Sequence, residues 1–152
     1  MADTRAQQAA EIWIVEHALP ALFEGRHFTS QKLELKWGGK FAFGAVSSAE
    51  DVVVCFSTSA AVTARGKQAT AKIQKLKTDA LYLLNIKKQS RIAMAFSELS
   101  MLNHFKKSQS AGRFPPEIEL VHTPLLTDMQ EQVLAARLAA SMETSPSSDT
   151  KR

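Results

Sequence analysis

The sequence lacks the features that mark secreted and membrane proteins. Its one cysteine, Cys55, cannot form a disulfide within the chain. The first 25 residues include acidic side chains and no uninterrupted apolar stretch, which argues against a secretory signal. No segment approaches the roughly 20 apolar residues of a membrane-spanning helix. We therefore expect a protein of the reducing cytoplasm that does not enter a membrane.

Aromatic residues are also scarce, at 7% of the chain, which gives poor support to a platform for stacking bases. The hydrophobic fraction of 45% and the charged fraction of 22% are those of an ordinary globular chain. A length of 152 residues suits one hydrophobic core. We predict a single domain over residues 1–143 and a disordered polar tail over residues 144–152.

The charge is concentrated in the middle of the chain. Residues 32–113 contain fourteen Lys and Arg against five Asp and Glu, whereas the two flanking segments carry net charges of −2 and −3. A basic segment attracts polyanions, of which DNA and RNA are the most common. The alternative interpretation is a lysine-rich surface that keeps the protein in solution.

Hydrophobic periodicity and turn residues predict an α/β (α+β) domain with a mixed central sheet flanked by helices. The expected α-β-β-β-α-β core has a helix over 5–23, ended or kinked by Pro20, and strands over 32–37, 40–47 and 52–58. A helix follows that begins between residues 63 and 66, with Arg65 and Lys67 in its first turn, and ends at Asp79. The remaining elements are strands over 80–86 and 91–96, a helix over 97–110 with Leu99 facing inward, an edge strand over 117–121 and a helix over 127–142.

This order of elements resembles the core of the PD-(D/E)XK nuclease superfamily over about residues 11–86. That family carries a metal-binding acid late in its second strand and an acid-X-lysine motif in its third. Here GGKFAFGAVS would be the second strand and VVVCFSTS the third, which places Gly44 and Ser57-Thr58-Ser59 at those positions. Because Mg²⁺ needs hard oxygen ligands, the resemblance implies a domain with no catalytic residues, metal or cofactor. The alternative is an enzyme with migrated acids, for which the candidates are Glu11, Glu16, Glu50 and Asp51.

The segment between the third strand and the next helix ends in Gly66-Lys67, like a phosphate-binding loop. Ala61 stands where that motif needs its first glycine, and Gln68 replaces its hydroxyl residue, which argues against an NTPase. The start of the helix can still hold a nucleic-acid phosphate without cleaving it. The expected phosphate contacts are Ser57, Ser59 and Thr63, and the expected nucleic-acid-binding cations are Lys40, Arg65, Lys67, Lys72 and Lys75. The competing interpretation is a capping loop with solvated cations.

Two function hypotheses follow. The first is a non-catalytic, nuclease-like domain that binds DNA or RNA. The second is a protein-interaction module, as a homo-oligomer or with another protein, whose contact surface is the last helix, through Gln132, Val133, Ala136, Leu138, Ala139 and Met142. The four histidines share no ligand spacing, which disfavours a zinc site, and Cys55 lies among apolar residues typical of a core strand.

Overall fold

The computed structural model describes residues 4–144, so the predicted tail lies outside the described residues except for Thr144. The fold is a single mixed sheet of five strands flanked by helices, in the order expected from the sequence. The strands are β1 (Phe28–Glu34), β2 (Lys40–Ser47), β3 (Val52–Ser57), β4 (Arg91–Phe96) and β5 (Glu119–His122). The helical elements are α1 (Arg5–Trp13), η1 (Ile14–Ala18), α2 (Leu19–Leu22), α3 (Thr70–Leu83), α4 (Leu99–Ser110) and α5 (Thr127–Thr144).

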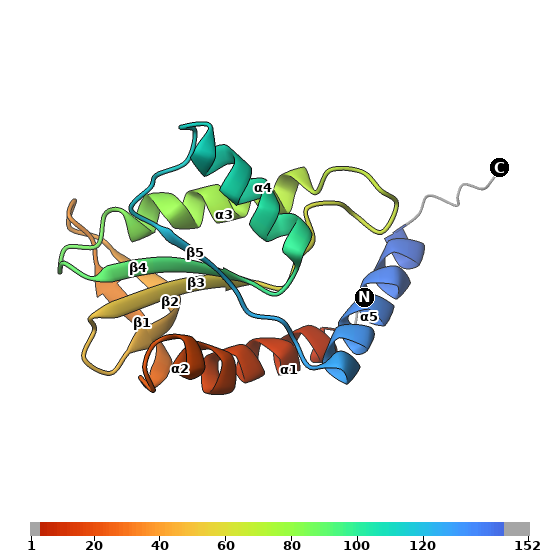
Figure 1. Cartoon of the computed structure of the whole chain (residues 1–152), viewed down its shortest axis with the longest axis horizontal. Helices are drawn as coiled ribbons and strands as arrows, with labels where there is room; N and C mark the ends of the chain where they lie inside the picture. Colours follow the sequence, from red (N-terminus) through yellow and green to blue (C-terminus); the bar gives the residue numbers. More distant parts are fainter. Residues whose placement is uncertain (1–3, 145–152) are drawn as a thin grey trace.

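The sheet is the middle of three layers and has helices on both faces (Figure 1). Strands β1, β2 and β3 pair antiparallel, and β3, β4 and β5 pair parallel. Helices α3 and α4, which make the two parallel connections, cover one face, and α1, η1 and α2 cover the other. Because β3 is buried from Val52 to Cys55, apolar residues of both layers meet it. No helix among residues 4–144 is long and apolar enough to cross a membrane.

The first helix covers the span predicted from the sequence, with a wider turn before Pro20. In η1 the Leu19 N–H bonds to the Ile14 carbonyl five residues back, which is the π-helical spacing. A proline has no N–H to donate and its ring crowds the preceding turn of an α-helix. The π-helical turn therefore lets the chain continue through Pro20 into α2.

Four details of the sequence-based assignment are wrong. The helix after β3 starts at Thr70, so Arg65 and Lys67 precede it, and residues 80–83 complete this helix instead of forming a strand. Ile86 then makes one isolated bridge to Leu35. Trp37 lies in the β1–β2 turn and Leu99 is exposed. A short apolar run has no period that distinguishes a buried helix end from a strand.

One polar network holds the turn that leads into β3. The Asp51 carboxylate accepts hydrogen bonds from Arg26 Nη2 at 2.9 Å and from Ser47 Oγ at 2.6 Å. Ser47 Oγ in turn accepts the backbone N–H groups of Asp51 and Val52. The Arg26 guanidinium and the Ser47 hydroxyl lower the pKa of Asp51 from 3.8 to about 2. The folded state thus favours the ionised carboxylate.

We predict that this carboxylate contributes to acid stability. Because its pKa is lower when folded, the contribution is complete above about pH 4 and is lost as the pH falls toward 2. Asp51→Asn should lower the free energy of unfolding at neutral pH, as measured by urea denaturation. Between pH 4 and 2, the free energy of unfolding should fall less in this variant than in the native protein. Glu50→Gln, which removes a longer 3.8 Å pair with Lys88, is the control. If the free energy of unfolding of Asp51→Asn falls as much as that of the native protein over this pH range, the prediction is contradicted.

Candidate functional site

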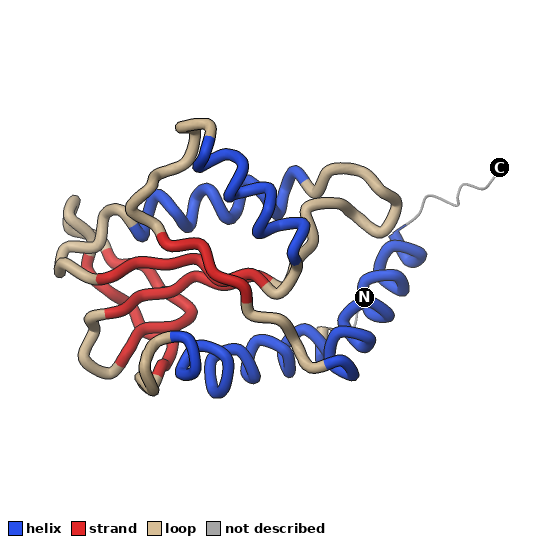
Figure 2. Tube along the Cα trace, viewed as in Figure 1, coloured by secondary structure: helices blue, strands red, loops and turns tan. Residues whose placement is uncertain are grey.

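The loop between β3 and α3 forms a small hairpin. Val62 bridges Gln68, the Thr63 N–H donates to the Lys67 carbonyl at 2.6 Å, and Gly66 turns the chain at a φ of 79°. Thr63 Oγ1 accepts the N–H groups of Arg65 and Lys67, which explains why no helix begins here. The loop is long and reaches from the end of the sheet toward α5 (Figure 2).

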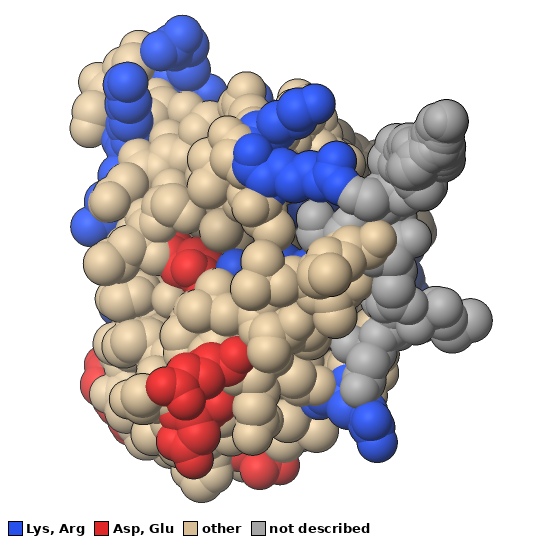
Figure 3. All heavy atoms as spheres, turned by 90° about the vertical axis from the view of Figure 1, so that its right-hand side faces the viewer, with Lys and Arg blue, Asp and Glu red and all other residues tan. Residues whose placement is uncertain are grey.

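This hairpin and α5 enclose a hollow of about 530 Å³, named here the outer hollow. Five of the eight residues predicted as contacts line it: Ser59, Thr63, Arg65, Lys67 and Lys72. Apart from Arg137, its other lining is small and apolar, and the described part of that lining includes no acidic residue. On the face shown in Figure 3, Lys and Arg gather mostly in the upper half and Asp and Glu in the lower half. The hollow is therefore a basic site.

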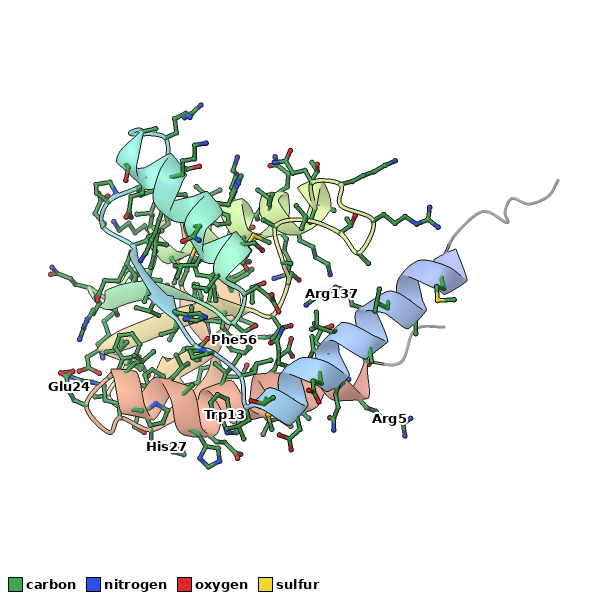
Figure 4. All side chains as sticks on the ribbon, turned by 45° about the vertical axis from the view of Figure 1, so that its right-hand side comes forward. Arg5, Trp13, Glu24, His27, Phe56 and Arg137 are labelled. Atoms are coloured by element: carbon green, nitrogen blue, oxygen red, sulfur yellow. The ribbon has the colours of Figure 1, made fainter. Side chains whose placement is uncertain are left out.

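The fourth cation at the outer hollow is Arg137 of α5, which the sequence analysis missed. Arg137 Nη2 donates to the Thr58 carbonyl at 2.8 Å and lies 3.7 Å from Glu98 Oε2. Glu98 Oε2 also accepts from Gln130 Nε2 at 2.6 Å. The guanidinium is one-quarter exposed and extends from α5 toward the ends of β3 and α3 (Figure 4). These contacts hold it in one orientation.

A second hollow of about 320 Å³, the inner hollow, lies beside the first. It is lined by Thr4 just before α1, by Gln7 of α1, by Thr58, and by residues of α5. Four residues line both hollows and form a shared wall: Ser59, Lys72, Arg137 and Ala140. The two hollows thus make one basic site at the carboxyl end of β3.

The other three predicted contacts lie elsewhere. Lys75 Nζ pairs with Asp79 Oδ2 at 3.0 Å, one turn along α3 from Lys72. Lys40 starts β2 beside Phe41, which stacks on Tyr82 at the far end of α3. At 1.5 Å per residue, that end is roughly 15 Å from Lys72. Ser57 Oγ accepts the Ser59 N–H and is not part of the lining.

The carboxyl ends of the parallel strands carry buried hydroxyl groups. Thr58, Ser97 and Thr123 directly follow β3, β4 and β5 and are all at least nine-tenths buried. Ser97 Oγ and Thr123 Oγ1 have no hydrogen-bond partner within residues 4–144. Because an unpaired buried hydroxyl is costly, this end of the sheet has polar capacity that the domain itself does not use.

The position that the nuclease resemblance assigns to a metal-binding acid is occupied by an aromatic ring. A Cβ on Gly44 would lie 2.8 Å from Phe56 Cε2. Glu11 and Glu16 of the first helix line the same shallow hollow of about 400 Å³ as Gly44 and Phe56. Among the candidate migrated acids, these two lie together. Asp51 is bound to Arg26 at the other end of β3.

The described residues contain no group of three His, Cys, Asp or Glu that could hold a metal ion. Cys55 is buried, and burial raises the pKa of its thiol above the ordinary value. The structure therefore agrees with the assignment of Cys55 to the core.

The residues of α5 that were predicted to form one contact surface lie on different sides of the helix. Val133 is buried against the domain and Ala136 is half-buried, whereas Leu138 and Met142 are exposed. Leu134 joins them, so three large apolar residues at a spacing of four form an exposed ridge (Leu134, Leu138 and Met142). Gln132 and Ala139 are exposed beside it.

Comparisons with protein-family models, with curated proteins and with solved structures find no match for this chain. The function must therefore be argued from the site.

We predict that Phe56 restricts the Gly44 position. Gly44→Ala should lower the free energy of unfolding by about 1–3 kcal/mol, because the new methyl group crowds the ring. The loss should be clearly smaller in a Phe56→Ala background, measured by urea denaturation as a double-mutant cycle. Gly39→Ala is the control, since nothing lies within 4 Å of its Cβ position. Equal losses in both backgrounds contradict the contact.

Proposed function

We propose that this domain binds nucleic acid, DNA or RNA, at the outer hollow without cleaving it, and that it does so in the cytoplasm. The observation that carries the proposal is the convergence of Arg65, Lys67, Lys72 and Arg137 on one hollow whose described lining has no acid. Phosphate contacts from lysine and arginine supply most sequence-independent affinity for nucleic acid. A hollow ringed by such side chains suits that ligand.

The contrast with other cations supports this choice. Arg26 is paired with Asp51, Arg91 with Glu119 at 2.9 Å, and Lys75 with Asp79. Arg65, Lys67 and Lys72 have no ion pair with any of residues 4–144. Their charges thus remain available to a ligand.

The non-catalytic part of the proposal rests on the sequence. Gly44, Ser57 and Ser59 stand where the resembled nucleases carry metal-binding and catalytic side chains. The ring of Phe56 over Gly44 adds support, because it fills space that a carboxylate would need.

We predict that Lys67→Glu/Lys72→Glu weakens binding of single-stranded DNA or RNA at least ten-fold at about 0.1 M salt. The slope of log affinity against log salt should become shallower by about 1.4, since each phosphate contact contributes about 0.7. Fluorescence anisotropy at several salt concentrations, with and without Mg²⁺, measures both. The matched control is Lys106→Glu/Lys107→Glu on the exposed side of α4.

Equal weakening in the two double variants would refute a localised site, and no change in either would refute the role of these lysines. A gel of the same samples checks that the probe stays intact. Cleavage that requires Mg²⁺ would contradict the non-catalytic proposal and direct attention to Glu11 and Glu16.

The exposed ridge of α5 supports a second candidate function, a protein-interaction module. Leu134, Leu138 and Met142 are 42%, 54% and 77% exposed, on a helix that packs on α1 with its opposite side. Exposed apolar side chains in a row are typical of contact surfaces. This candidate needs no ligand in the basic hollow and is tested separately.

If the ridge mediates self-association, the sedimentation mass should rise with protein concentration, and Leu134→Ser/Leu138→Ser should remain monomeric. The control is Leu81→Ser/Leu99→Ser, which replaces two exposed leucines on α3 and α4. A monomeric native protein at high concentration contradicts self-association, as does dissociation of the control variant.

A further inference from the structure

We propose that the shared wall binds the phosphate monoester at the end of a nucleic-acid strand. This inference rests on the nucleic-acid binding proposed above and names the group that the site receives. Its basis is the pair of cations at the wall, Lys72 and Arg137, together with the shape of the two hollows.

The charge at the wall suits a monoester better than a diester. A terminal phosphate carries a charge of about −1.5 to −2 at pH 7, whereas a backbone phosphate carries one negative charge. The wall offers the ammonium of Lys72, the guanidinium of Arg137 and the hydroxyl of Ser59. A planar guanidinium matches two phosphate oxygens at once.

Arg137 is already held in position for such a contact. Its Nη2 atom bonds to the Thr58 carbonyl, and Glu98 lies on the same side. Nε and Nη1 make no hydrogen bond to any described residue. Since the side chain is fixed before a ligand arrives, binding loses less side-chain entropy than at a freely rotating arginine.

The two hollows differ in size, at about 530 Å³ for the outer and 320 Å³ for the inner. Arg65 and Lys67 line only the outer hollow, where the hairpin loop meets solvent. Behind the shared wall, the inner hollow is bounded by Gln7 of α1 and Val133 of α5, and these helices pack against each other. A strand that enters past Arg65 and Lys67 therefore reaches the shared wall beside a smaller hollow of about 320 Å³, which suits a terminal phosphate better than a continuing strand.

The lining favours recognition of the phosphate over the base. The apolar part of the outer hollow comes from alanines and Val62, and the described lining contains no aromatic ring. Stacking on an aromatic ring is the usual source of affinity for an unpaired base. The terminal phosphate must then carry most of the preference, largely independent of base identity.

The test compares short single-stranded oligonucleotides that end in a 5′-phosphate, a 3′-phosphate or hydroxyls only, by fluorescence anisotropy with the full chain. One phosphorylated end should bind about ten-fold tighter than the hydroxyl end, equivalent to about 1.4 kcal/mol. In Arg137→Gln and in Lys72→Gln, the affinities for the phosphorylated end and the hydroxyl end should differ by less than two-fold. Lys106→Gln, which removes one charge from α4, should retain it. Lys72→Gln decides the result if Arg137→Gln loosens α5, because Lys72 has no partner within residues 4–144.

Equal affinity for all three probes would overturn the inference while leaving nucleic-acid binding intact. Loss of binding to every probe would overturn both. A free nucleoside monophosphate should displace the phosphorylated probe only at concentrations at least 100-fold above the Kd of that probe. Displacement near that Kd would assign the wall to a free nucleotide and would overturn the strand-end proposal. Preference that survives in Lys72→Gln and Arg137→Gln would refute the role of the shared wall.

Discussion

The parallel pairing of β3 with β4 is the constraint from which the rest of the structure follows. Two parallel strands cannot be joined by a tight turn, so the chain must cross one face of the sheet and return to the end at which the first strand began. Helix α3 makes that crossing and buries Ile73 and Leu76 on the way. Because β3 is also buried on its other face, the first helix must cover it there. The loop of residues 58–69 is thereby fixed at the carboxyl end of β3, which is where the basic hollows lie.

The sequence predicted the elements whose signals are local. Strand β4 has the predicted bounds, because its apolar run from Ile92 to Phe96 is continuous and turn residues precede it. The β1–β2 hairpin follows from Gly38, which takes a φ of 101°. The start of α3 was not predictable in this way, since the pairing of Val62 with Gln68 is a contact that periodicity does not encode. A helix end and a strand look alike over residues 80–86 for the same reason.

The sequence predicted part of the lining of the outer hollow but not Arg137. Ser59, Thr63, Arg65, Lys67 and Lys72 are neighbours in sequence, so one loop and one helix turn bring them together. Arg137 belongs to a C-terminal segment with a net negative charge, and charge counting by segment assigns no binding role to it. Only the packing of α5 on α1 places it opposite Lys72. Lys40 lies apart from the others, because the sheet and α3 place it at the opposite end of the domain.

Glu98 explains how the domain tolerates cations gathered at one hollow. Like charges repel, but Arg65, Lys67 and Lys72 are exposed, so water and salt screen their repulsion. Arg137 is the most buried of the four, and it is the one with a nearby carboxylate. That carboxylate is also bonded to Gln130, so the group that pairs with Arg137 attaches α5 to the start of α4. The same contact therefore stabilises the empty domain and orients the guanidinium. A bound phosphate would add a second anion at Nε and Nη1 of Arg137, which make no hydrogen bond to any described residue, so it would not have to replace the contact of Nη2 with Thr58.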